Sequence, residues 1–176
     1  MAFTDPQQNI QHLNLREGMS VADFGTGSGH YALLLSRVVG ESGRVYAVDI
    51  QRDLLARLKN QATQERLCNI MITWGDIESL GGSKLREGIL DAVVLSNMLF
   101  QVEQDKVVAQ EVKRVLKPGG RVLVIDWTDS FGYMGPRPED IVPLDKVREL
   151  FSAEGFTEEE TFDAGDHHYG IVFKKA

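Results

Sequence analysis

The sequence predicts an α/β protein built on a doubly wound, mostly parallel sheet of seven strands. Five short β-rich runs alternate with longer segments, several of them amphipathic, which is typical of parallel strands joined by right-handed crossovers. The last two runs are too close in sequence for a crossover helix, so we expect a C-terminal antiparallel hairpin. A turn with three glycines directly follows the first apolar run, at the sheet edge where such folds bind ligands.

The expected elements follow in chain order. A short polar helix near residues 6–15 precedes a buried strand at 19–24 and a helix at 28–39, whose apolar residues at helical spacing are Tyr31, Leu34, Leu35 and Val38. Strands at 44–50 and 69–74 flank a charged helix at 52–65, and GGSK at 81–84 predicts a loop. The nearly all-apolar run at 89–97 is typical of a central strand covered on both faces.

In the second half, a helix at 102–116 should stop at KPGG, because Pro118 and two glycines cannot continue it. A fifth strand at 121–127 leads into a Gly/Pro-rich loop at 129–140. A helix at 144–154 and strands at 156–163 and 168–174 complete the chain. We expect one domain over 1–176, with a short N-terminal segment at 1–18 and a loop at 128–143 near the active edge.

Composition excludes several functional classes. With 19 Lys and Arg against 26 Asp and Glu, the chain carries a formal charge of −7, which disfavours nucleic acid as a partner. The one cysteine, Cys68, cannot form an intramolecular disulfide or a cysteine-cluster metal site, and we expect no metal. No signal peptide is visible, and no apolar run approaches the ~20 residues of a membrane span. These features predict a cytoplasmic protein.

The glycine turn and three acidic residues predict a nucleoside-type ligand. Gly25, Gly27 and Gly29 give G-x-G-x-G, whereas a dinucleotide fingerprint has G-x-G-x-x-G, so the spacing disfavours NAD. A turn that serves only helix packing is the other alternative. Asp23 precedes the turn, and Asp49 closes the second strand twenty residues after Gly29, where a carboxylate can accept both ribose hydroxyls. The third acid, Asp76, follows the third strand.

Four motifs in this order resemble the class I S-adenosylmethionine-dependent methyltransferases, in particular the ubiquinone/menaquinone methyltransferase-like branch. They are DFGTGSG, AVDI, GDI and LKPGGRVLVIDW, and the resemblance covers about residues 19–124. It implies a Rossmann-like methyltransferase fold, S-adenosyl-L-methionine as cofactor and S-adenosyl-L-homocysteine as product.

The resemblance also implies which residues bind the cofactor. Those for its methionine half are Asp23, which would hold the amino group, Gly25, Thr26, Gly27, Gly29, Ser96, Asn97 and Met98. Those for its adenosine half are Asp49 at the ribose, Ile50 against the adenine, Asp76 at the adenine amino group and Ile77. Asp76 has an alternative as an ordinary turn residue.

Methyl transfer from a sulfonium mainly needs alignment, and a general base only where the acceptor must lose a proton. In the family's sheet the last strand lies antiparallel to the fifth, which brings the ends of both strands together. The candidate catalytic residues at this place are His168, His167 and Asp126, and those for substrate are Trp127, Tyr133 and Tyr169. Alternation along the strand predicts His167 and Tyr169 on one side and His168 on the other. A solvated hairpin turn is the alternative.

We expect a small-molecule acceptor. SNML stands where DNA amino-methylating enzymes have an N-P-P-Y type sequence, and Cys68 alone cannot replace the several cysteines of arsenite methyltransferases. Only about eighteen residues precede the first strand, so we expect a substrate lid to be nearly missing. The pocket is then open, covered by the loop at 130–138, or completed by the second subunit of a homodimer or by a partner subunit. The alternatives are a macromolecular acceptor (RNA or protein) and a cofactor-binding module without activity of its own that serves a catalytic partner.

Overall fold

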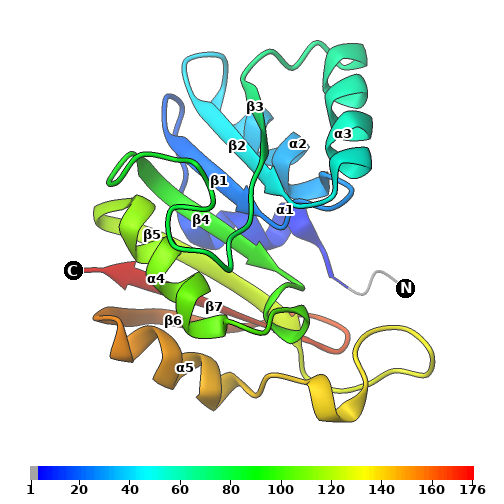
Figure 1. Cartoon of the computed structure of the whole chain (residues 1–176), viewed down its shortest axis with the longest axis vertical. Coiled ribbons are helices and arrows are strands. Elements are labelled where there is room, and N and C mark those ends of the chain that lie inside the picture. The colour runs from blue at the N-terminus through cyan, green and yellow to red at the C-terminus, as the bar shows by residue number, and fades with distance from the viewer. Residues whose placement is uncertain (1–3) are drawn as a thin grey trace.

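The computed structural model describes residues 4–176 as one seven-stranded sheet with helices on both faces (Figure 1). The strand order is β3-β2-β1-β4-β5-β7-β6, and only β7 runs against the other strands. The strands are β1 (Ser20–Phe24), β2 (Arg44–Asp49), β3 (Ile70–Trp74), β4 (Leu90–Ser96), β5 (Leu116–Trp127), β6 (Phe156–Gly165) and β7 (His168–Lys175). The doubly wound sheet and its C-terminal hairpin are therefore confirmed.

Two apolar layers hold the helices to the sheet. The α-helices are α1 (Pro6–Asn9), α2 (His30–Val39), α3 (Arg52–Gln64), α4 (Asp105–Val115) and α5 (Leu144–Ala153), and the 3₁₀ turns are η1 (Ile10–Leu13), η2 (Leu99–Gln101) and η3 (Pro138–Asp140). One layer joins α4 and α5 to the sheet, and the other joins η1, α2 and α3 to its opposite face. No helix in residues 4–176 is long and apolar enough to cross a bilayer.

The strand order reverses between β1 and β4. Phe24, at the end of β1, pairs with Val48 of β2 on one side and with Leu95 of β4 on the other. The carboxyl ends of these three strands therefore lie level, and helices leave them toward opposite faces. This is the topological switch point where open α/β sheets bind ligands.

Three local predictions were wrong. β5 begins at Leu116 rather than at residue 121, since Leu116 pairs with Leu90 and a register shift between Leu90 and Ala92 accommodates the KPGG segment. α4 begins at Asp105 rather than at residue 102, because Val102, which follows the turn η2, has an extended backbone with a φ of −91° and a ψ of 145°. Val38 of α2 is 43% exposed, since the neighbouring Val39 occupies the buried face.

Candidate functional site

Two adjoining cavities lie at the carboxyl ends of β1, β2 and β4. The first, of about 130 Å³, is lined by Asp49, Ile50, Asp76 and Ile77 among others. The second, of about 280 Å³, is lined by Asp23, Thr26, Gly27, Ser96 and Asn97 among others. Gly25, Met98 and Gln101 line both cavities. The two groups of residues expected for the adenosine and methionine halves of one cofactor thus lie in two spaces that share a wall.

The glycine turn allows close approach at this wall. Gly25 has a φ of +73°, and a Cβ added there would lie 2.0 Å from Sδ of Met98. Gly29 has a φ of +82°, but an added Cβ would lie 2.4 Å from Cδ1 of Leu58 in α3. Gly29 is not among the residues that line the two cavities. The structure therefore gives Gly29 a role in helix packing, unlike Gly25 and Gly27.

Asp23 lies in the methionine-side cavity and is almost fully buried. Its Oδ2 accepts hydrogen bonds from Oγ1 of Thr26 at 2.6 Å and from the amide of Ala32 at 3.1 Å. Burial raises the pKa of Asp23 to about 6, against these two hydrogen bonds, and the charge of Asp49 adds to the rise. A buried carboxylate of this kind favours a cationic partner such as an ammonium group.

Asp49 accepts from two backbone amides in the adenosine-side cavity. Oδ2 accepts from Gly27 at 2.9 Å and Oδ1 from Gln51 at 2.8 Å. A carboxylate has about four acceptor positions, so the same oxygens can also accept from a ribose diol. The Gly27 contact joins the glycine turn to the end of β2 and so fixes the turn that also contains Gly25.

Asp76 is exposed and caps its own turn. Its Oδ1 accepts from the amide of Glu78 at 2.9 Å and its Oδ2 from the hydroxyl of Ser79 at 3.3 Å. Ile77 beside it is buried, whereas Ile50 across the cavity is 62% exposed. Asp76 therefore has the turn role that was expected as its alternative, and it also lines the adenosine-side cavity.

Asn97 connects the methionine-side cavity to the C-terminal hairpin. It has a left-handed backbone with a φ of +56°, and its Oδ1 lies 3.0 Å from Nε2 of His168. Nδ1 of His168 lies 2.9 Å from the carbonyl oxygen of Asp166. Two oxygen partners require either a doubly protonated ring or an Asn97 amide turned to donate, and in both cases the two nitrogens of His168 are engaged.

The hairpin places the predicted aromatic and histidine residues side by side. Trp127 pairs with His168 in the β5–β7 register, and their ring centroids are 4.2 Å apart. His167 lies in the turn before β7, with a φ of +66°, so strand alternation does not apply to it. Nδ1 of His167 lies 2.5 Å from Oδ1 of Asp129, and its ring stacks on Phe131 at 4.4 Å.

The other predicted residues of this group lie apart from the histidines' polar contacts. Asp126 accepts from the amides of Leu99 and Trp127 at 2.9 Å each, and burial raises its pKa to about 6. Tyr169 is buried and donates to the carbonyl of Val142 at 2.9 Å, and burial, with the charge of Asp126, raises its pKa. Tyr133 is fully exposed. Asp126 therefore holds the start of η2 in place, and Tyr169 belongs to the core.

Sequence reasoning missed two residues of this edge. Gln101 lines both cavities, but its place depends on the 3₁₀ turn η2, which no periodic pattern marks. Asp129 is the carboxylate that pairs with His167. No local pattern distinguishes it from Asp126, which was the acid expected at this edge.

A larger hollow of about 610 Å³ lies at the opposite edge of the sheet. It is lined by Arg44, Asn69 and Cys68, among others, at the amino ends of β2 and β3. None of the sequence motifs reaches it. The two smaller cavities, which contain the motifs, define the candidate site.

Comparisons with known proteins identify the family of the chain. A family model described as a methyltransferase domain matches residues 15–162. The chain is 36% identical over 117 residues to an arsenite methyltransferase of Aquipseudomonas alcaligenes, covering 64% of this chain and 34% of that protein. It is 30% identical over 142 residues to a ubiquinone/menaquinone biosynthesis C-methyltransferase of Klebsiella pneumoniae, covering 78% of this chain and 51% of that one.

Solved structures extend the likeness over the whole chain. A SAM-dependent methyltransferase from Aquifex aeolicus superposes with a TM-score of 0.89 at 26% identity, covering 99% of this chain and 91% of that one. The [4+2]-cyclase SpnF superposes with a TM-score of 0.82 at 16% identity, covering 97% and 79%, which shows the fold alone.

The fold is a doubly wound α/β sheet, and the candidate site lies at its topological switch point. The chain belongs to the class I S-adenosylmethionine-dependent methyltransferases, whose cofactor is S-adenosylmethionine. The matched part of the chain spans about a third of the arsenite methyltransferase and about half of the ubiquinone/menaquinone biosynthesis C-methyltransferase.

Proposed function

We propose that the protein transfers the methyl group of S-adenosylmethionine to a small-molecule acceptor. The observation that carries this proposal is the pair of cavities that share Gly25, Met98 and Gln101. Asp49 lies in one cavity and the buried Asp23 in the other. One extended ligand with a diol at one end and an ammonium at the other fits this distribution of carboxylates.

The cofactor, when bound, supplies a methyl group on a positively charged sulfur, and displacement leaves S-adenosylhomocysteine. The residues of the chain then mainly align the reactants. Asp49 holds the ribose hydroxyls, with Ile50 and Ile77 on the adenine side, and Asp23 holds the ammonium group. Ser96, Asn97 and Met98 line the space beside the shared wall, where the acceptor would meet the methyl group.

For an acceptor that must lose a proton, we assign the general base to His167. Its Nδ1 lies 2.5 Å from Oδ1 of Asp129, and this contact orients the imidazole ring. His168 instead acts through Asn97, and Asp126 acts through η2, so neither is assigned a proton-transfer step. Gly135 of the 128–143 loop packs on Trp127, where an added Cβ would lie 2.8 Å from Cζ3. That packing makes Trp127 a wall under the loop.

The relatives narrow the acceptor class. One relative is named for arsenite and the other for the biosynthesis of ubiquinone and menaquinone, and all three compounds are small molecules. Arsenite favours several soft thiolates, whereas Cys68 is the only cysteine and lies at the opposite edge of the sheet. We therefore propose an organic acceptor.

Calorimetric titration with S-adenosylmethionine, S-adenosylhomocysteine and NAD in parallel tests the cofactor site, and S-adenosylhomocysteine formation with a panel of organic acceptors tests the activity. We expect binding of the first two ligands and none of NAD. Binding of NAD alone would contradict the assigned site. Cofactor binding without turnover on any acceptor in the panel would favour a module that needs a catalytic partner.

A further inference from the structure

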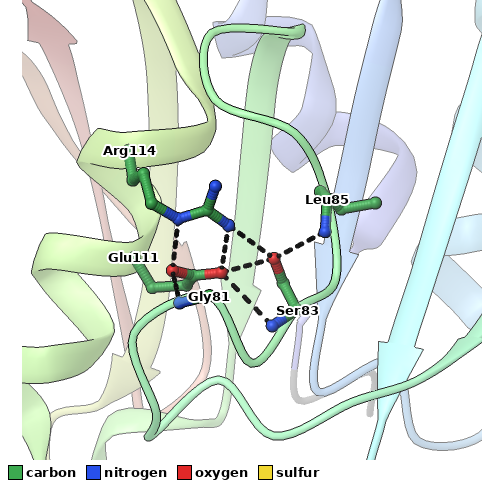
Figure 2. Close-up of polar contacts among 5 residues, drawn as sticks. All are labelled: Gly81, Ser83, Leu85, Glu111 and Arg114. Carbon is green, nitrogen blue, oxygen red and sulfur yellow. Dashed lines mark hydrogen bonds and ion pairs between the residues drawn. The ribbon is translucent and has the colours of Figure 1, made fainter.

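A buried carboxylate on α4 connects that helix to the loop between β3 and β4. Glu111 has no exposed surface, and its carboxylate accepts from Gly81, Ser83 and Arg114 (Figure 2). The amide of Gly81 lies at 2.7 Å and the amide of Ser83 at 3.2 Å, and the hydroxyl of Ser83 lies at 2.5 Å. Nε and Nη2 of Arg114 lie at 2.8 and 2.7 Å.

The negative charge of Glu111 is paired with the positive charge of Arg114. Burial alone would raise the pKa of this carboxyl group, but hydrogen bonds from Arg114, Ser83 and Gly81 hold it below its usual value. A buried, ionised group with a full set of donors strongly resists displacement, because moving any donor leaves charge unpaired. The loop residues that donate to Glu111 are therefore fixed relative to α4.

The fixed turn holds the residues of the adenosine-side cavity. The carbonyl of Gly82 accepts from the amide of Asp76 at 3.1 Å, and a Cβ on Gly82 would lie 1.9 Å from the Asp76 carbonyl oxygen. The backbones of the Glu111-bound turn and of Asp76 are thus in direct contact. Asp76 and Ile77 both line the cavity.

A second carboxylate ties the same loop to the start of α4. Oε2 of Glu78 accepts from the amides of Glu103 and Gln104, at 2.7 and 2.8 Å, immediately before the helix begins. Glu78 also lines the adenosine-side cavity. The loop is therefore attached at two places, through Glu111 to α4 itself and through Glu78 to the residues that precede α4.

We infer that Glu111 is a positioning residue for the adenosine half of the cofactor, acting through the turn of Gly81–Ser83 and the backbone of Asp76. This inference rests on the proposed cofactor site. Glu111 does not touch either cavity, so its effect on binding is indirect. This effect on affinity should appear with any ligand that fills the adenosine-side cavity, including a ligand that lacks the amino-acid part of the cofactor.

Two ligands separate this role from a general loss of structure. S-adenosylhomocysteine fills both cavities in the proposed site, whereas 5′-methylthioadenosine lacks the amino-acid part. In Glu111→Gln, the new side-chain NH₂ group replaces one carboxylate oxygen and cannot accept the hydrogen bonds that Gly81, Ser83 and Arg114 donate. We expect its affinity for both ligands, measured by calorimetry well below the melting temperature, to fall by the same factor of about ten.

Matched variants complete the test. Glu159 of β6 forms an ion pair with Arg121 of β5, away from the cofactor edge. Glu159→Gln makes the same chemical change there and should leave the affinities for both ligands unchanged. Asp23→Asn should weaken S-adenosylhomocysteine alone. If Glu111→Gln melts at a lower temperature but binds 5′-methylthioadenosine as the wild type does, Glu111 is only structural and the inference is wrong.

Two further outcomes are decisive. If Glu111→Gln does not fold, Ser83→Ala removes one donor and keeps the ion pair, and about threefold weaker binding of both ligands is expected. Unchanged binding in that variant contradicts the inference. If Asp49→Ala leaves the affinity for 5′-methylthioadenosine unchanged, the cofactor site itself is misplaced, which is a separate failure.

Discussion

The cofactor edge and the hairpin edge of this site are built from different kinds of contact. At the cofactor edge, the carboxylates of Asp23, Asp49 and Asp76 all accept from backbone amides within a few tens of residues. At the hairpin edge, His167 pairs with Asp129 and His168 with Asn97, which are 38 and 71 residues away. Backbone-held acids follow from turn geometry, whereas side-chain pairs between distant strands depend on the completed sheet.

This difference predicts that substitutions at the two edges separate cofactor binding from turnover. Substitutions at the cofactor edge should change affinity, and those at the hairpin edge should mainly change the reaction with the acceptor. The expected effects are largest where a charged group meets the cofactor directly.

Asp49→Ala should have the largest effect. It removes the acceptor for two ribose hydroxyls, so the affinity for S-adenosylhomocysteine should fall about 100-fold or more. It also leaves the amides of Gly27 and Gln51 without their acceptor, with a loss of unfolding free energy of about 1–3 kcal/mol. Calorimetry and thermal melting measure the two effects, and unchanged affinity in a folded variant would contradict the role of Asp49.

Within the glycine turn, Gly29→Ala and Gly27→Ala should differ in kind. At Gly29 the positive φ and the contact with Leu58 should lower the unfolding free energy by about 2–4 kcal/mol. At Gly27 the nearest atom to an added Cβ lies at 3.9 Å, so about 1 kcal/mol is expected from φ alone. Gly27→Ala should instead weaken S-adenosylhomocysteine binding, since Gly27 lines the cavity. Equal effects of the two variants on affinity would show that Gly29 also contacts the cofactor.

The affinity for S-adenosylhomocysteine should depend on pH through Asp23. With its pKa raised to about 6, Asp23 binds a proton as the pH falls through that value and loses the charge that attracts the ammonium group. Affinity should therefore be constant above about pH 7 and fall by up to about tenfold per pH unit below 6. Titrations between pH 5 and 8 test this, with Asp23→Asn as the control that should bind weakly and show a flat profile. A wild-type profile without the decrease would exclude Asp23 as the partner of the ammonium.

The two histidines should give the smallest effects on binding and should differ from each other. His168→Ala removes a buried partner of Asn97, so we expect a melting temperature several degrees lower and affinity about two- to fivefold weaker. His167→Ala should leave both unchanged and reduce turnover by about 10²–10⁴-fold with an acceptor that loses a proton. Asp129→Asn should follow His167→Ala in turnover. Full turnover in His167→Ala would exclude it as the base.

The cofactor edge was predictable because its residues are close to turns that the sequence marks. Gly25 and Gly27 of DFGTGSG, the acid closing AVDI and the acid of GDI all line the two cavities, at strand ends that must meet in a doubly wound sheet. At the hairpin edge, the family resemblance predicted only that the end of the fifth strand meets the beginning of the last strand, and the structure supplied the register that pairs Trp127 with His168. Which acid would meet a histidine was not predictable, because Asp126 and Asp129 differ only in where the chain turns after β5.

The alternation of strands and helices, the C-terminal hairpin and the glycine turn at the carboxyl end of the first strand were predictable from the sequence by itself. These features depend on local periodicity, on turn residues and on the rule that crossovers are right-handed. The tertiary structure alone decided that Glu111 holds the loop before β4, that Gln101 reaches both cavities and that His168 bonds Asn97. Such contacts join residues far apart in the chain, and their existence depends on side-chain direction and burial, which no local pattern encodes.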